Sequence, residues 1–90
     1  MLIPNYTKQF NKDLNKIKKS GNKKIKKIKD LITKLIKQEI LDPIYDDHKL
    51  IGNYAGRREC HIESDWLLIY KIDGKNITFE RTGSHAELFG

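Results

Sequence analysis

The sequence predicts an α+β protein in which two helices cover one face of an antiparallel sheet. Three observations predict this class. Apolar residues recur at spacings of three and four between Phe10 and Ile36, as on the buried stripe of a helix. Residues 58–62 and 77–82 instead alternate between apolar and polar, as in strands with one buried face. Asp42-Pro43 separates the two patterns, because the residue before a proline disfavours helix.

The first half is expected to hold one short strand and two helices. Pro4 restricts a strand within residues 1–7 to a sheet edge, because proline has no backbone N–H. Thr7 is a suitable N-cap for a helix with the stripe Phe10, Leu14 and Ile17. Ser20-Gly21-Asn22 ends this helix. A second helix follows, with the apolar face Ile25, Ile28, Leu31, Ile32, Leu35 and Ile36.

The second half is expected to be a three-stranded meander. Residues 44–56 have two glycines and no sustained period, which indicates a connecting loop. Strands are predicted at 58–62, 66–72 and 77–82, with turns at Ser64-Asp65 and Asp73-Gly74. The predicted order is therefore β-α-α-β-β-β, in a single domain spanning residues 1–90.

Composition limits the class of protein. With 38% hydrophobic and 33% charged residues, the chain is typical of a globular protein rather than a disordered one. No apolar run approaches the roughly 18–20 residues that span a bilayer. The N-terminus lacks a secretory signal pattern. The single cysteine, Cys60, excludes an internal disulfide and indicates a reducing cytoplasm. We therefore expect a cytoplasmic protein with no membrane partner.

Positive charge is concentrated in the first half of the chain. Residues 1–40 contain twelve lysines and three acidic residues, a net charge of +9, whereas residues 41–90 have a net charge of −3. A basic surface of this density favours a polyanionic partner, with RNA as the leading candidate. The same lysines are also explained as a solvated helix surface, so basicity alone leaves both interpretations open.

The residues suited to chemistry cluster in the second half. All three histidines (His48, His61 and His85), all three arginines and the only tryptophan lie between positions 48 and 85. His61 and Asp65 flank one turn. Arg81 lies near the end of the last strand, and His85 follows four residues later. In an antiparallel meander these positions meet at the same end of the sheet.

Two imidazoles, a carboxylate and a guanidinium suit metal-independent cleavage of RNA. The 2′-hydroxyl must lose a proton to attack phosphorus, and the departing 5′-oxygen must gain one. Histidine can serve in either role near neutral pH. A guanidinium can neutralise the charge on the phosphorus-centred transition state. We expect no metal and no cofactor.

Each residue also has a simpler interpretation. Three histidines and Asp65 could hold zinc, but no pair has a short ligand spacing. Cys60 could be a nucleophile beside His61, although strand alternation points it toward the core. Trp66 could stack on a base or pack in the core. Asp65 could simply make its turn.

Four motifs in order and spacing resemble the YafQ-type toxins of the RelE/ParE superfamily. They are Asp47-His48-Lys49-Leu50-Ile51-Gly52, Arg58-Glu59-Cys60-His61-Ile62, Asp65-Trp66-Leu67-Leu68-Ile69-Tyr70 and the run from Glu80 to Phe89. The resemblance is dense over residues 46–90 and follows only the helical pattern before that. It implies a RelE-like fold and a ribosome-dependent mRNA endonuclease made with a neutralising antitoxin.

Carried over by position, the resemblance implies catalytic roles for His48, His61, Asp65, Arg81 and His85. His85 is implied as general acid, His61 and Asp65 as general base and its orienting group, and Arg81 as the phosphate ligand. His48 is implied to support phosphate or proton transfer. Contacts to RNA are expected from Trp66, Phe89, Arg57, Arg58 and Lys49. The implied partners are a cognate antitoxin, the ribosome and mRNA, with operator DNA bound only as a toxin–antitoxin complex.

Two other functions are possible on the same scaffold. One is an inhibitor of a protein target, like the ParE-type gyrase inhibitors, although those relatives generally lack this set of histidine, aspartate and arginine. The other is an inactive protein that binds an antitoxin or operator. Ser64 departs from the proline that many relatives have at this turn, which puts the presentation of Asp65 in doubt.

Overall fold

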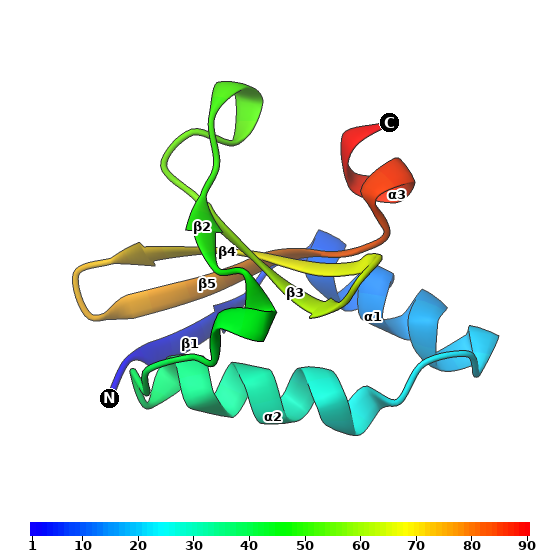
Figure 1. Cartoon of the computed structure of the whole chain (residues 1–90), viewed down its shortest axis with the longest axis horizontal. Helices are drawn as coiled ribbons and strands as arrows, with labels where there is room; N and C mark the ends of the chain where they lie inside the picture. Colours follow the sequence, from blue (N-terminus) through cyan, green and yellow to red (C-terminus); the bar gives the residue numbers. More distant parts are fainter.

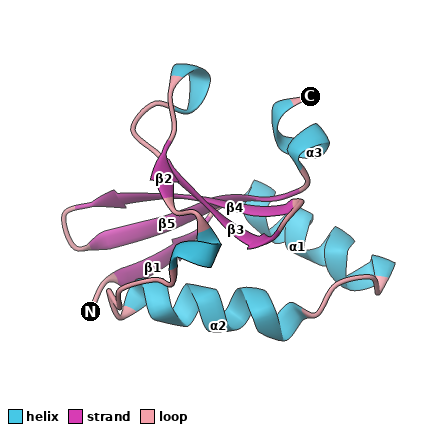
Figure 2. Cartoon of the chain, in the orientation of Figure 1, coloured by secondary structure: helices cyan, strands magenta, loops and turns pink.

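The computed structural model describes all residues 1–90 as a five-stranded mixed sheet with two helices on one face (Figures 1 and 2). The strands are β1 (Ile3–Tyr6), β2 (His48–Lys49), β3 (Arg58–Glu63), β4 (Trp66–Asp73) and β5 (Asn76–Gly83). The α-helices are α1 (Lys8–Ser20), α2 (Ile25–Ile36) and α3 (His85–Phe89). Two 3₁₀ helices flank β2: η1 (Pro43–Tyr45) precedes it and η2 (Gly52–Tyr54) follows it. The α+β class and the two helices on one face are confirmed.

The sheet has the strand order β1-β5-β4-β3-β2. The β3-β4-β5 meander is antiparallel as predicted, but β1 pairs with β5 in parallel, with Tyr6 opposite Phe79. The expectation of a wholly antiparallel sheet is therefore corrected. A tight hairpin forces its two strands to be antiparallel, whereas β1 and β5 have no such connection between them. Pro4 lies in an edge strand, where its missing N–H costs no ladder bond.

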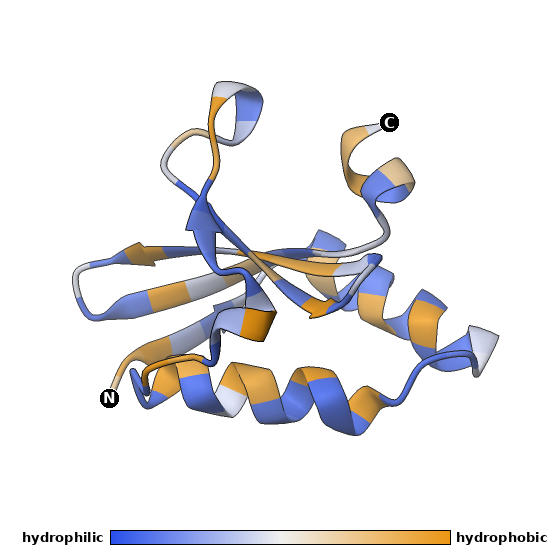
Figure 3. Ribbon diagram, in the orientation of Figure 1, coloured by the Kyte–Doolittle hydropathy of each residue, from blue (hydrophilic) through white to orange (hydrophobic).

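The main core lies between the sheet and the helices α1 and α2. Figure 3 shows hydrophobic and hydrophilic positions alternating along α2, as expected for a helix with one buried stripe. From the helices this core takes Phe10, Ile17, Ile28, Leu31, Ile32 and Leu35. From the sheet it takes Cys60, Trp66, Leu68, Tyr70, Ile77 and Phe79. No helix of the structure has the length and apolar character needed to cross a bilayer.

A smaller cluster lies on the opposite face, which we call the open face of the sheet. It consists of Leu67, Ile69 and Leu88, with Leu50 and Tyr54 packed against them. Two segments project from this face, the loop that contains η2 and the short helix α3 (Figure 1). Neither β2 nor α3 is expected from the sequence pattern. Both place functional side chains on the open face.

Candidate active site

The three histidines form a row on the open face. His48 comes from β2, His61 from β3 and His85 from the start of α3. The ring centroids are 6.3 Å apart for His48 and His61 and 5.6 Å apart for His61 and His85. Strand alternation places His61 on the face opposite Cys60, so the imidazole faces away from the helices. The structure thus brings together residues that are 37 positions apart at the ends of the row.

Glu59 lies beneath this row and is absent from the sequence-based candidates. Its Oε2 is 3.2 Å from Nε2 of His48 and 3.5 Å from Nε2 of His61. The side chain is only 6% exposed, and its second oxygen, Oε1, is buried without a hydrogen-bond partner. Glu59 and His61 are two residues apart on one strand, so alternation alone indicates that they share a face. A buried carboxylate between two imidazoles can stabilise their protonated forms and orient their rings.

His48 is further held by the loop before β2. Its Nδ1 donates to the carbonyl oxygen of Asp46 at 2.6 Å, which leaves Nε2 facing Glu59. Asp46 has a φ of 47° in the left-handed region, a conformation that aspartate tolerates better than most residues. Its carboxylate Oδ2 also lies 3.7 Å from Nε2 of His61. Two carboxylates therefore flank the pair of imidazoles.

Asp65 contacts His85 rather than His61. Its Oδ1 accepts hydrogen bonds from the backbone N–H of His85 at 2.9 Å and from Nδ1 of the same residue at 2.7 Å. The backbone hydrogen bond, followed by the side-chain bond, lowers the pKa of the Asp65 carboxyl. The expectation that Asp65 orients His61 is corrected, because α3 turns back over the open face and presents His85 to the β3–β4 turn.

A capping box fixes the start of α3. The Ser84 hydroxyl accepts from the backbone N–H of Glu87, whose carboxylate accepts from the backbone N–H of Ser84. The Glu87 carboxylate also lies 3.0 Å from Nζ of Lys16. These contacts lower the pKa of Glu87 to about 2, with the Ser84 backbone hydrogen bond as the largest cause. The Ser-x-x-Glu spacing is a sequence signal that could have predicted α3.

Arg81 lies on β5, two strands away from β3, which carries Glu59 and His61. On the open face it is opposite Ile69, which in turn is opposite Glu59. Two strand spacings, about 10 Å, therefore separate the backbones of Arg81 and Glu59. The guanidinium is held by Asp13 of α1, with Nε to Oδ2 at 2.8 Å and Nη2 to Oδ1 at 3.2 Å. This pairing is the largest cause of the raised pKa of Arg81. The convergence of the Arg81 side chain on the histidines stays a prediction.

Trp66 does not reach the open face. It has no exposed surface, and its Nε1 donates to Oγ1 of Thr82 at 2.9 Å within the helix-side core. Trp66 shares its face with Leu68 and Tyr70, because the side chains of a strand alternate. The expected contact between this indole and an RNA base is therefore wrong, and the alternative of a core residue is confirmed.

The remaining basic candidates are differently placed. Arg58 lies on the same face as Cys60, where its Nε is 3.3 Å from Oδ1 of Asp47, a carboxylate that also accepts from the Tyr70 hydroxyl at 2.7 Å. Arg58 is thus turned away from the histidines, because its strand position has the opposite parity to His61. Nε of Arg57 is 2.6 Å from a carboxylate oxygen of Glu80. Lys49 is exposed on β2.

Cys60 takes no part in the site. It is fully buried in the helix-side core, and this burial raises the pKa of its thiol. A thiol held in this state is a poor nucleophile, because the thiolate is the reactive form. The expectation that Cys60 packs under the helices is confirmed.

An aromatic pair borders the open face beyond the histidine row. Phe89 of α3 is 47% exposed, and its ring centroid is 5.4 Å from that of Tyr54, with the two planes at 80°. The Tyr54 hydroxyl donates to the carbonyl oxygen of Leu88 at 3.3 Å. Gly83 permits this approach of α3, because a Cβ there would lie 3.1 Å from Oε1 of Glu87.

The matching family model spans residues 2–90 and is described as the bacterial toxin of type II toxin–antitoxin systems, YafQ. The chain belongs to the YafQ toxin family. The mRNA interferase toxin YafQ of Escherichia coli K12 is 45% identical over 86 residues, covering 94% of this chain and 92% of the relative.

Solved structures of bacterial toxins have the same fold. An E. coli DinJ–YafQ complex matches with a TM-score of 0.89 and 43% identity over the full length of both chains. A structure described as a metal-bound toxin from Helicobacter pylori matches with a TM-score of 0.88 and 37% identity over 99% of this chain and 100% of the other. In the present structure no group of three or more His, Cys, Asp or Glu side chains is arranged to hold a metal ion.

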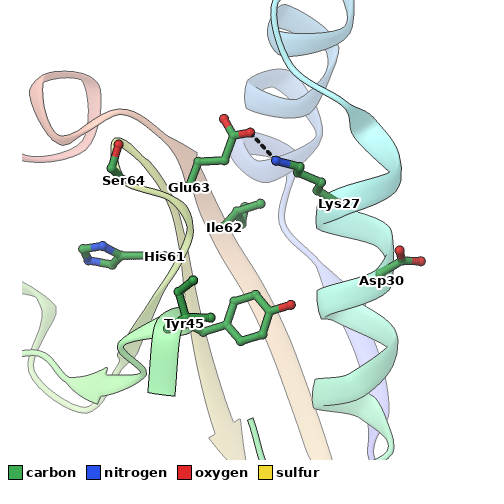
Figure 4. Close-up of a pocket in the computed structure, with 8 residues that line it drawn as sticks. Lys27, Asp30, Tyr45, His61, Ile62, Glu63 and Ser64 are labelled. Atoms are coloured by element: carbon green, nitrogen blue, oxygen red, sulfur yellow. Dashed lines mark hydrogen bonds and ion pairs between the residues drawn. The ribbon is translucent and has the colours of Figure 1, made fainter. Parts of the chain in front are cut away.

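A pocket of about 520 Å³ adjoins the row at the free edge of β3 (Figure 4). In Figure 4 the His61 ring points away from α2, whereas Ile62 points toward it and Glu63 is paired with Lys27. The pocket therefore lies mainly on the helix side of β3, with His61 at its rim. The open face carries the groups suited to chemistry.

Proposed function

We propose that this chain is an mRNA interferase, an endoribonuclease toxin that cuts mRNA on the ribosome. The observation that carries the proposal is the row of three imidazoles with Glu59 beneath one end and Asp65 beside the other. The naming of the E. coli relative as an mRNA interferase supports the same activity. The basic first half of the chain suits a surface rich in RNA.

The proposed reaction uses the 2′-hydroxyl of the RNA as nucleophile. The 2′-oxygen forms a bond to phosphorus, the bond from phosphorus to the 5′-oxygen breaks, and a 2′,3′-cyclic phosphate and a 5′-hydroxyl result. One proton leaves the nucleophile and one reaches the departing oxygen. Two imidazoles whose centroids are 5.6 Å apart can flank a single phosphodiester for these two transfers.

His85 is proposed as the general acid. Its Nδ1 is engaged by Asp65, so Nε2 is the nitrogen left to face the substrate. The ionised Asp65 stabilises the imidazolium that donates the proton. His61, which lies beside the Glu59 carboxylate, is proposed to accept the proton of the 2′-hydroxyl. His48, which shares Glu59, is proposed to support phosphate charge or proton transfer.

Arg81 and Phe89 are proposed to hold the RNA beyond the reacting atoms. Arg81 lies two strands from Glu59, a separation that suits a neighbouring part of the RNA backbone. Asp13 holds the Arg81 guanidinium in one orientation, so Arg81 needs little reorganisation to bind a phosphate. The exposed Phe89 ring can stack on an unpaired base.

An antitoxin is the proposed regulatory partner. The E. coli relative is solved as a complex with DinJ. A protein segment that covers the open face would shield both the histidine row and Arg81. We place the chain in the cytoplasm, where ribosomes and mRNA are available to it, and we expect operator DNA to be bound only by the toxin–antitoxin complex.

The test is cleavage of mRNA on programmed ribosomes by the purified chain and by His85→Ala. A chelator selective for zinc and copper is used, because ribosomes need magnesium. We expect cuts at codon positions by the unmodified chain with and without chelator, and a rate lower by roughly 10²–10⁴ for His85→Ala. Equal cutting by both proteins would remove His85 from its role. Absence of any cut would refute the proposed activity, and loss of cutting with chelator would refute metal independence.

A further inference from the structure

Tyr54 joins the two segments that project from the open face. It ends η2, in the loop between β2 and β3, and lies 34 positions from its hydrogen-bond partner Leu88 in α3. Both segments rise from the same side of the sheet in Figure 1. The Tyr54 ring meets Phe89, and its hydroxyl donates to the Leu88 carbonyl oxygen. No group from the helix-side core takes part in these contacts.

The far end of α3 depends on this contact. A helix of five residues has too few internal hydrogen bonds to be stable alone. Its first turn is fixed by Asp65 and by the capping box of Ser84 and Glu87. Near its end, Leu88 packs on Leu67 and Ile69, and Tyr54 is the side chain that contacts Phe89. Without Tyr54, the Phe89 ring would be free to rotate into solvent.

The geometry of the two rings leaves room for a ligand. With planes at 80°, the rings meet edge to face, an arrangement favoured by the aromatic quadrupole. Phe89 is still 47% exposed, so part of the ring remains accessible for stacking. The Tyr54 side chain also contributes to the raised pKa of Arg81, after the larger effect of the Asp13 hydrogen bond.

We propose that Tyr54 is a positioning residue that orients Phe89 to stack on the base of a nucleotide next to the cut. The inference rests on the proposed function, in which Phe89 stacks on an unpaired base, and adds to it the role of Tyr54 in orienting that ring. The ligand is an unpaired base of single-stranded mRNA. Stacking on an aromatic face tolerates any base, so the site contributes to binding and alignment more than to sequence choice.

A double-mutant cycle separates this role from simple support of the fold. Single-turnover cleavage on programmed ribosomes is measured for the unmodified chain, Tyr54→Leu, Phe89→Leu and the double variant. If Tyr54 acts through Phe89, we expect Tyr54→Leu to lower kcat/KM by roughly 5- to 100-fold, and by less than about twofold when Phe89 is already leucine. Equal losses in both backgrounds would overturn the inference.

An abasic substrate gives a second readout. Ribosomes are programmed with mRNA that lacks the base at each nucleotide flanking the cut in turn. We expect the unmodified chain to lose roughly 5- to 100-fold at one of these positions. Tyr54→Leu should cut intact and abasic mRNA at similar rates, whereas Tyr54→Phe, which keeps the ring, should preserve the discrimination. Discrimination retained by Tyr54→Leu would overturn the inference.

Two controls test whether a variant is folded and whether loss of stability alone explains its effect. They are thermal unfolding of every variant and the substitution Tyr6→Leu. Tyr6 is a half-exposed tyrosine that packs on Phe10 and Phe79 on the helix side, so its loss should lower stability without changing abasic discrimination. If Tyr54→Leu does not fold, Tyr54→Met, which keeps volume beside Leu88 without a ring, takes its place. Failure of the unmodified chain to cut any mRNA would overturn the proposed function and this inference together, whereas cutting with independent losses would overturn this inference alone.

Discussion

Asp65 binds His85 twice, through the backbone N–H at 2.9 Å and through Nδ1 at 2.7 Å, with the same carboxylate oxygen accepting both. One residue of the β3–β4 turn thereby sets both the start of α3 and the orientation of its imidazole. The Nε2 atom is consequently the ring nitrogen that this pairing leaves free. The orientation of this imidazole therefore depends on a single exposed carboxylate.

Asp65→Asn should lower the rate of cleavage. The pKa of Asp65 is lowered by its bonds to His85, so the carboxylate is ionised at neutral pH. Asparagine keeps an acceptor oxygen but removes the charge that strengthens the hydrogen bonds to His85. We expect the cleavage rate near neutrality to fall about tenfold. Asp73→Asn, at the exposed end of β4, is the matched control, and an unchanged rate for Asp65→Asn would contradict the proposed role.

Glu59→Gln should separate activity from stability. Glu59 is buried and has one oxygen without a partner, which makes its charge costly to the folded state. Glutamine keeps the shape and removes the charge shared by His48 and His61. We expect cleavage to fall by at least roughly tenfold while the midpoint of thermal unfolding stays the same or rises. Cleavage at the original rate would show that the carboxylate is not needed by the imidazoles.

Asp13→Asn should weaken both the fold and the grip on Arg81. Asp13 accepts from Nε and Nη2 of Arg81 and from the backbone N–H of Thr82, and it is only 11% exposed. The asparagine amide replaces one carboxylate oxygen with an NH₂ group, so one of these donors loses its acceptor. We expect a loss of about 1–3 kcal/mol in the free energy of unfolding, measured by urea titration. Asp30→Asn, on the exposed surface of α2, should leave it unchanged. Equal effects of the two substitutions would argue against a structural role for the Asp13–Arg81 pair.

Glu87 should contribute stability that depends on acid pH. Its pKa is about 2 in the folded chain, against an ordinary value of 4.5, so the folded state binds this proton less readily than the unfolded state. The contribution is therefore complete above about pH 4.5 and is lost as the pH falls toward 2. We expect Glu87→Gln to be less stable than the unmodified chain at neutral pH, with the gap closing across this window. Urea unfolding at a series of pH values checks this, and a gap independent of pH would contradict it.

The elements that the sequence predicts correctly are those with local signals. The stripes of α1 and α2 and the alternation in β3 and β5 depend on neighbours a few positions away, so the pattern is enough. The parallel pairing of β1 with β5 has no local signal, because the sequence of a short edge strand does not show whether it runs parallel or antiparallel to its neighbour. The two-residue strand β2 is too short to show any period.

The same distinction explains the site. His61 and His85 are brought together by the meander and by a short connection, and so their proximity can be predicted from topology. The partner of Arg81 is Asp13, 68 residues earlier, which no spacing rule identifies. The predicted RNA contact of Trp66 is wrong because tryptophan is common at interfaces, whereas the alternation of side chains along β4 places this one in the core. Glu59 is missed because a charged residue in a strand is ordinarily exposed.

The parallel neighbour of β5 has a consequence for biosynthesis. Thr7, at the junction of β1 and α1, bonds to Glu80, a partner 73 residues later. During translation, β1, α1 and α2 are therefore synthesised well before β5, against which β1 and α1 pack. Contacts between residues so far apart in the sequence form slowly. Asp13 cannot bind Arg81 until β5 has been synthesised. The three imidazoles likewise cannot come together before His85 has been synthesised. The side chains of the site therefore cannot take up their observed arrangement until the last part of the chain has been synthesised.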